Sequence, residues 1–318
     1  MAEERKSHVY GPVPSRRLGR SLGVDLVPFK VCSFDCIYCQ LGPTTTKTLS
    51  REEYVPVEQL VADVRAALAD DARPDYITLA GSGEPTLHIY LDEIIVRIKK
   101  LTDIPVALLT NGSLFFRRDV RQDAALADVV LPSLDAPDGE LFRRINRPHP
   151  GIEFARLVGG LVRFREEYAG EIWLEVFLLK GINDAEAHVA RFNAHIERIR
   201  PDRIHLNTAV RPAAEANVRP VAREDMARLC RLFGPKASVA AGSDDTRTEH
   251  RFEVTCERVL DLLSRRPCTL HDVAAGLGIH PNEAVKHIHA LRAERRITAE
   301  RRDRETYYLA RPESARRG

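Results

Sequence analysis

Three cysteines close together are the feature of this 318-residue chain that most directly predicts chemistry. Cys32, Cys36 and Cys39 have the spacing C-x3-C-x2-C, and Tyr38 directly precedes the last of them. Thiolates that converge from one short loop are typical ligands of an iron–sulfur cluster. The next cysteine, Cys230, lies far along the chain, so three ligands would leave one iron of a [4Fe–4S] cluster open for a substrate or cofactor.

The same spacing would also place the three cysteines on one face of a helix, where buried thiols are inert. Pro28 and Gly42 flank the segment and favour a short loop instead. We therefore interpret the segment as a loop that holds a cluster.

The motif resembles the signature of the radical S-adenosylmethionine (SAM) superfamily, in which the open iron binds the amino and carboxylate groups of SAM. The run from Tyr10 to Val24 is similar to a branch that contains the wybutosine-precursor synthases, which modify transfer RNA, and uncharacterised bacterial relatives. The likeness extends to about Pro212. It implies a [4Fe–4S] cluster, SAM, and an electron donor such as flavodoxin or ferredoxin. Those synthases hold a second cluster with further N-terminal cysteines, and no cysteine precedes Cys32 here, so the reaction is expected to differ.

The resemblance also implies SAM contacts. Ser82, Gly83 and Glu84 stand where the superfamily has a glycine-glycine-glutamate motif, with serine in place of the first glycine. Gly83 would allow the backbone to approach SAM closely, and the Glu84 carboxylate would accept hydrogen bonds from its ammonium group. Contacts to the SAM ribose and carboxylate are expected from two loop positions: Asn111 and Ser133, with Asp135 as an alternative to Ser133.

Several basic residues are candidates for binding an anion. Arg16, Arg17 and Arg20 precede the first expected strand and would clamp the SAM carboxylate or a substrate phosphate, because guanidinium groups bind oxyanions bidentately. A solvated basic arm is the alternative. Lys180 and Arg211 could face the substrate from the far side of the site.

Strand patterns alternate with helix patterns, which predicts an α/β fold with a parallel sheet. The expected strands are Ser21–Pro28, Tyr76–Ala80, Pro105–Leu109, Asp128–Leu134, Glu171–Leu179 and Arg203–Thr208. The clearest expected helices are Val57–Ala69, Ile89–Leu101, Ala185–Ile199 and Arg223–Phe233. Six such units are too few for a closed eight-stranded barrel, so we expect a partial (β/α)6 barrel of TIM type. Polar loops follow each strand, and the cysteine loop follows the first, so all should meet at one rim.

The chain is expected to divide into a radical SAM core over residues 1–240, a polar linker over 241–250 and a winged helix-turn-helix domain over 251–318. The expected elements of the last are helices Phe252–Leu263, Leu270–Ala275 and Pro281–Arg292 and strands Ile297–Ala299 and Thr306–Leu309. Their shared core should consist of Val273, Leu277, Ile279, Val285, Ile288 and Leu291.

This domain could bind nucleic acid through Lys286 and Arg292 on its last helix and Arg301, Arg302 and Arg304 in the wing. Acidic residues dilute this basic character. Docking of a protein or peptide, or simple packing, are the alternatives.

Composition and charge indicate where in the cell the protein is expected. The net charge is +2, no run of about 18 apolar residues is present, and the first residues lack the apolar core of a secretory signal. We therefore expect a cytoplasmic protein with no membrane association.

Three functions remain open. The first is modification of RNA by hydrogen abstraction, and the second is modification of a peptide or protein. The third is a DNA-binding sensor of redox state or iron, which the six polar loops argue against because a sensor needs no SAM pocket.

Overall fold

The computed structural model has six parallel strands at the centre of its main sheet. It describes residues 7–15, 17–69, 73–211, 213–240, 255–277, 279, 281–302 and 305–311. The sheet has the order β1-β2-β5-β6-β7-β8-β9-β10, and all neighbours from β2 to β10 run parallel. The predicted α/β class and the six predicted strands are confirmed, and the order is that of a partial barrel.

The strands of this sheet are β1 (Val9–Ser15), β2 (Gly19–Val24), β5 (Tyr76–Leu79), β6 (Val106–Thr110), β7 (Val129–Pro132), β8 (Glu171–Leu178), β9 (Arg203–Thr208) and β10 (Ala237–Val239). Two of them were not predicted. β1 pairs antiparallel with β2, and β10 extends the sheet beside β9. The first predicted strand, Ser21–Pro28, is wrong at its end, because the Asp25 N–H donates to the His8 carbonyl rather than continuing the parallel ladder.

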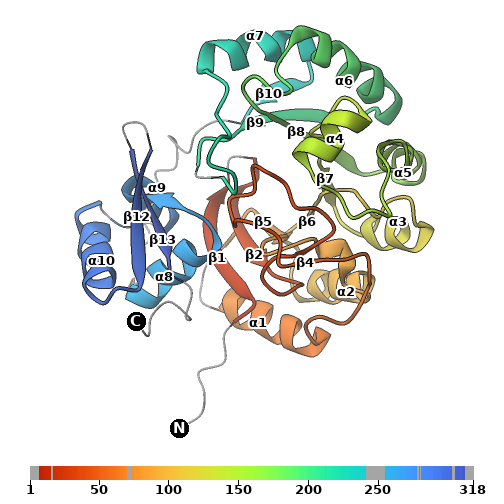
Figure 1. The fold of residues 1–318 in the computed structure, drawn as a ribbon. Helices are drawn as coiled ribbons and strands as arrows, with labels where there is room; N and C mark the ends of the chain where they lie inside the picture. Colours follow the sequence, from red (N-terminus) through yellow and green to blue (C-terminus); the bar gives the residue numbers. More distant parts are fainter. Residues whose placement is uncertain are drawn as a thin grey trace.

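Seven helices connect these strands and surround the sheet (Figure 1). They are α1 (Val57–Ala69), α2 (Leu91–Leu101), α3 (Arg118–Ala124), α4 (Gly139–Ile145), α5 (Phe154–Glu167), α6 (Glu186–Ile199) and α7 (Arg223–Phe233). α1 and α7 have the predicted bounds. The predicted helix Ile89–Leu101 is wrong at its start, because His88 forms a parallel bridge with Glu52 and the Ile89 N–H donates to the Glu52 carbonyl. A short 3-10 helix, Pro85–Leu87, precedes this bridge.

Side chains alternate across the parallel strands and build two different interiors. One face, including Val106, Leu108, Val130 and Leu174, belongs to the large core shared with the helices. The other face forms a small separate cluster of Leu18, Ala107, Val129, Leu131 and Trp173. Nearer the carboxyl ends of the strands, the residues on this second face are polar. The small apolar cluster therefore lies directly below a polar site.

The C-terminal elements form a second, smaller core. They are α8 (Cys256–Arg265), β11 (Cys268–Thr269), α9 (Leu270–Leu277), α10 (Pro281–Ala293), β12 (Ile297–Arg302) and β13 (Glu305–Ala310). The three strands form an antiparallel sheet of order β11-β13-β12. Val273, Ile288 and Leu291 are buried as predicted, whereas Val285 is 43% exposed, so its place in the predicted core is wrong.

The reason for this error is local. Val285 follows Ala284, and Ala284 is the residue that α10 turns inward. The predicted linker over 241–250 lies outside the described residues, as does the start of the predicted helix Phe252–Leu263.

The C-terminal elements contact the barrel at its first strand and at the loop after β9. Val13 of β1 packs against their core, and α8 and α9 lie beside β1 (Figure 1). The Tyr307 hydroxyl donates to the Val210 carbonyl at 2.7 Å. No helix within the described residues is long and apolar enough to cross a membrane.

Candidate active site

The cysteine loop lies at the carboxyl ends of the strands and is tied to the rest of the fold by its backbone. The short strands β3 (Val31–Cys32) and β4 (Thr46–Lys47) pair with each other and frame the loop. The Asp35 and Ile37 N–H groups donate to the carbonyls of Asn146 and Ile145, which end α4. The loop predicted from the spacing is therefore present, and it is fixed at both sides.

Each cysteine sulfur receives one side-chain donor. Lys30 Nζ lies 3.0 Å from Cys39 Sγ, Asn146 Nδ2 lies 3.5 Å from Cys36 Sγ, and Asn111 Nδ2 lies 3.6 Å from Cys32 Sγ. Lys30 is buried. Hydrogen bonds to sulfur stabilise thiolate charge and tune the potential of an iron–sulfur cluster.

The donor set fits a [4Fe–4S] cluster. Burial, with a contribution from the Glu84 carboxylate, raises the pKa of Cys32 to about 12, and burial raises the pKa of Cys36 well above its ordinary value. Coordination to positive iron would deprotonate these thiols outright. Among the described residues no three His, Cys, Asp or Glu side chains converge on a single ion.

Gly83 and Glu84 join the cysteine loop to the neighbouring strands. A Cβ on Gly83 would lie 1.9 Å from the Val31 carbonyl oxygen, so the position requires glycine. Glu84 is buried, and its Oε1 accepts from the hydroxyls of Thr86 and Thr110 at 2.5 and 2.6 Å. Its Oε2 accepts from the Asn111 N–H at 2.8 Å. Burial raises the pKa of Glu84 despite these bonds.

Asn111 and Asp135 face the cysteine loop rather than solvent. Asn111 Nδ2 donates to Ser33 Oγ at 2.8 Å. Asp135 is buried and accepts from the Tyr38 hydroxyl and from Asn146 Nδ2, the latter at 3.1 Å. Burial raises the pKa of Asp135. The loop after β6 therefore supplies the donor to Cys32, and the loop after β7 supplies the carboxylate that binds Tyr38 and Asn146.

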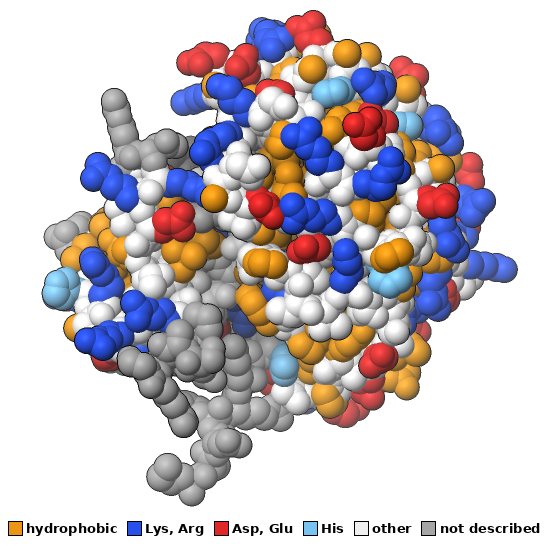
Figure 2. All heavy atoms as spheres, viewed as in Figure 1, with side chains coloured by type: hydrophobic (Ala, Val, Ile, Leu, Met, Phe, Trp, Pro, Cys, Tyr) orange, Lys and Arg blue, Asp and Glu red, His pale blue; other side chains and the backbone are white. Residues whose placement is uncertain are grey.

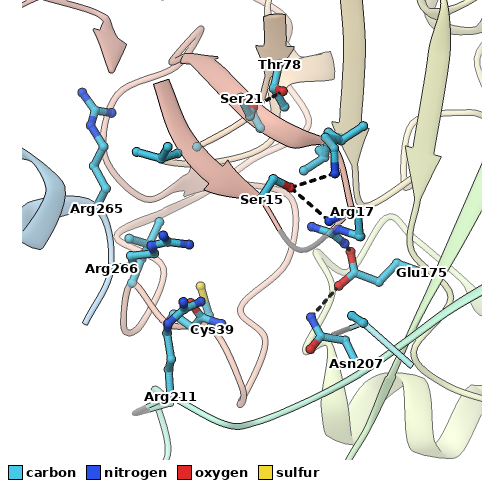
Figure 3. Close-up of a pocket in the computed structure, with 18 of the residues that line it drawn as sticks. Ser15, Arg17, Ser21, Cys39, Thr78, Glu175, Asn207, Arg211, Arg265 and Arg266 are labelled. Carbon is cyan, nitrogen blue, oxygen red and sulfur yellow. Dashed lines mark hydrogen bonds and ion pairs between the residues drawn. The ribbon is translucent and has the colours of Figure 1, made fainter. Parts of the chain in front are cut away.

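A cavity of about 390 Å³ opens beside Cys39. Its lining includes polar residues of the strands, among them Ser21, Thr78, Glu175 and Asn207 (Figure 3). Ser133 and Asp135, which follow β7, also line it. Tyr38 and Phe177 also line it, and their rings stack at 4.1 Å between centroids. A cavity of this size with many polar groups and an aromatic surface suits a small polar cofactor.

The structure separates the predicted anion-binding residues. Arg17 and Arg211 line the cavity, where Arg17 forms an ion pair with Glu175. Among the described residues that line the cavity, neither Arg20 nor the exposed Lys180 is present. Arg16 lies outside the described residues.

Sequence reasoning missed several lining residues. Tyr38 was noted only as an aromatic neighbour of Cys39, and Glu175 lies inside an apolar strand, where a single acidic residue was the available signal. Arg265 and Arg266 come from the end of α8 and also line the cavity. No local pattern could have placed these two arginines beside the cysteines.

A parallel partial barrel with a three-cysteine loop beside a cofactor-sized cavity defines an iron–sulfur enzyme of radical type. The sequence model of the radical SAM superfamily matches residues 26–192, which is more than half of the chain. The chain belongs to the radical SAM superfamily, and its cofactors are a [4Fe–4S] cluster and SAM.

Two similar proteins match most of the chain. The chain is 35% identical over 316 residues to a UPF0026 protein of Helicobacter pylori strain J99, covering 98% of this chain and 100% of that protein. It is 40% identical over 273 residues to a protein of Brachyspira hyodysenteriae named GTPase Obg, covering 85% of this chain and 40% of that protein. The chain thus spans well under half of the Brachyspira protein.

A solved structure shows the same fold. A radical SAM methyltransferase from Sphaerobacter thermophilus superposes with a TM-score of 0.52 over 69% of this chain and 65% of that chain, at 19% identity. This likeness concerns the fold alone.

Proposed function

We propose that Cys32, Cys36 and Cys39 hold the [4Fe–4S] cluster and that SAM lies in the adjoining cavity. With both groups bound and one electron supplied, the site would support cleavage of SAM to methionine and a 5′-deoxyadenosyl radical, which would take a hydrogen atom from a substrate. Gly83, Glu84, Asn111 and either Ser133 or Asp135 are the proposed SAM contacts. An electron donor such as flavodoxin or ferredoxin would supply the electron.

The roles of these residues follow from their bonds. Glu84 Oε1 already accepts from the Thr86 N–H and from the hydroxyls of Thr86 and Thr110. Oε2 accepts only from the Asn111 N–H among the described residues and has further acceptor capacity for an ammonium group. Asp135 orients Tyr38, whose ring stacks on Phe177. This stacked pair would cover a bound cofactor and exclude water, which prevents loss of a reactive intermediate.

We further propose that the C-terminal elements form a winged helix-turn-helix domain that delivers an RNA substrate. The observation that carries this proposal is the composition of the cavity wall: it runs from the barrel strands to Arg265 and Arg266 of the C-terminal elements. A molecule bound by those elements could therefore reach the radical site directly.

The surface of these elements is suited to contact with phosphates. Lys286 and Arg292 on α10 and Arg301 on β12 are exposed. Arg302 is half-buried and donates to the Arg211 carbonyl, so it contributes less to an open surface. Figure 2 shows basic side chains on both the C-terminal elements and the adjoining barrel, mixed with acidic ones. The similarity of the Tyr10–Val24 run to the wybutosine branch also points to transfer RNA.

Binding of transfer RNA to the full-length, reconstituted protein tests this proposal. The double variant Arg292→Ala, Arg301→Ala should bind more weakly and lower the slope of log affinity against log salt by roughly 0.7–0.9 for each lost phosphate contact. Arg163→Ala, which removes an exposed arginine from α5, should change neither quantity. An unchanged slope in the double variant would contradict RNA binding by these elements.

The same preparation separates the alternatives. Stimulation of SAM cleavage by peptide but not by RNA would favour peptide or protein modification. Absence of SAM cleavage from a protein that retains its cluster and binds DNA would favour a redox or iron sensor.

A further inference from the structure

Three arginines meet where the barrel contacts the C-terminal elements. Arg211 follows β9, Arg265 is the last residue of α8, and Arg266 caps that helix. All three line the cavity, and Figure 3 shows them on the opposite side from Arg17, Glu175 and Asn207. We refer to Arg211, Arg265 and Arg266 as the arginine wall.

The wall is built into the structure and is not a loose surface cluster. Arg211 is 8% exposed and pairs with Asp272 at 3.2 Å. The side chain of Arg265 is 11% exposed, pairs with Asp25 and lies 4.0 Å from the ring centroid of Tyr10. Two of the three guanidinium groups are therefore held at fixed positions by residues of both parts of the molecule.

Two arginines of the wall have buried donor groups without a partner among the described residues. The buried Nε atoms of Arg211 and Arg265 have no hydrogen-bond partner among the described residues. The Arg266 side chain is half-buried and forms no hydrogen bond or ion pair with a described residue, although its charge helps to lower the pKa of Asp272 after the larger effect of Arg211. Three carboxylates, Asp272, Asp25 and Asp261, pair with Arg211 and Arg265, but the two buried Nε donors remain without partners, which is unfavourable.

Repulsion between the Arg211 and Arg266 charges also favours a bound anion. Burial lowers the pKa of Arg211, and the neighbouring Arg266 charge lowers it further. An oxyanion between these groups would offset the repulsion and accept from the free N–H groups. Phosphate and carboxylate both match guanidinium geometry with two parallel hydrogen bonds, and the RNA function proposed above makes phosphate the anion to expect here.

We propose that the arginine wall is a binding subsite for a phosphate group of the substrate, with Arg266 as its open member. The proposal extends the RNA function given above, since RNA would supply the phosphate as a diester. It also explains why the C-terminal elements contribute to the cavity: they would position the substrate's phosphate while the barrel positions SAM.

Uridine 5′-monophosphate and uridine, bound to the cluster-loaded full-length protein with SAM present, isolate the contribution of the phosphate. Uridine is chosen because an adenine base would compete for the SAM site. The parent protein should bind the monophosphate at least roughly tenfold more tightly than uridine. Arg266→Gln should remove most of this ratio, and Arg266→Lys should retain part of it. Arg163→Gln, on the outer surface of α5, should leave the ratio intact.

Arg266 is the residue to change because it has no ion pair with a described residue to lose, so its variants should keep the melting temperature of the parent. A parent protein that does not discriminate the monophosphate from uridine would overturn the subsite. So would an Arg266→Gln protein that keeps the full ratio.

Binding of short RNA in the same series separates the subsite from the RNA function. Loss of the ratio in Arg266→Gln together with weaker RNA binding supports both proposals. Loss of the ratio in a protein whose parent binds no RNA supports the subsite and refutes the RNA function, leaving a free nucleotide as the source of the phosphate.

Discussion

At the scale of single residues, the cysteine loop depends on donors from distant parts of the chain. Lys30, Asn111 and Asn146 each donate to one cysteine sulfur, and the last two belong to the loop after β6 and to the end of α4. The fold therefore sets the electrostatic environment of all three proposed cluster ligands. The spacing of the cysteines predicted the ligands, but it could not predict these partners.

Replacing Cys36 by alanine is expected to abolish the cluster and SAM cleavage together. The parent should bind about four irons after anaerobic reconstitution, and the variant close to none, because two ligands cannot retain a cluster of this type. Iron analysis, visible absorbance and 5′-deoxyadenosine formation provide the measurement. Cys230→Ala, on α7, should behave as the parent. A full cluster in Cys36→Ala would show that the ligands are misassigned.

At the scale of elements, the central parallel strands could be predicted from the sequence, whereas the edge strands β1 and β10 could not. β6 and β7 are buried apolar runs, and most residues of β8 are buried and apolar, so these strands are recognisable without knowledge of the fold. β1 contains Gly11, Pro12 and Pro14, which argue against a strand, and it exists because it pairs with β2 and supports α9. β10 has three residues and is defined by its neighbour β9.

The candidate site likewise has residues that the sequence predicted and contacts that it could not predict. Cys32, Gly83 and Glu84 belong to local motifs and were found from the sequence. The bond between Tyr38 and Asp135 joins residues 97 positions apart, and Arg265 reaches Asp25 from the far end of the chain. Such contacts arise from packing between elements, which a single sequence does not specify.

Two adjacent glycines on α5 provide a test of this packing. A Cβ on Gly160 would lie 2.7 Å from backbone atoms of Phe115 and Phe116, whereas a Cβ on Gly159 would meet nothing within 4 Å. Gly159→Ala should raise the free energy of unfolding by about 0.5–1 kcal/mol through helix propensity. Gly160→Ala should lower it by about 1–3 kcal/mol because the neighbouring backbone must move. Chemical denaturation measures both, and equal effects would contradict the packing of α5 against this loop.

At the scale of the whole molecule, the six parallel strands form an incomplete barrel whose polar cavity extends to the C-terminal elements. The barrel contributes the cysteine loop and the proposed SAM contacts, and α8 contributes Arg265 and Arg266. Asp25 links the two parts, because it accepts from the Ser82 N–H in the proposed SAM motif at 2.8 Å and pairs with Arg265. A substrate that engages both parts would therefore contact residues connected to the SAM site.

The central claim is that this radical SAM enzyme acts on RNA brought to the cavity by its C-terminal elements. Its most direct test is the rate of 5′-deoxyadenosine formation by the reduced, cluster-loaded, full-length protein with SAM, measured with transfer RNA, with a peptide mixture and with neither. We predict that transfer RNA raises the rate of 5′-deoxyadenosine formation above the basal value and that mass spectrometry detects a modified nucleoside in that RNA. Peptides should leave the rate at its basal value. A rate raised by peptides and unaffected by RNA would contradict the claim.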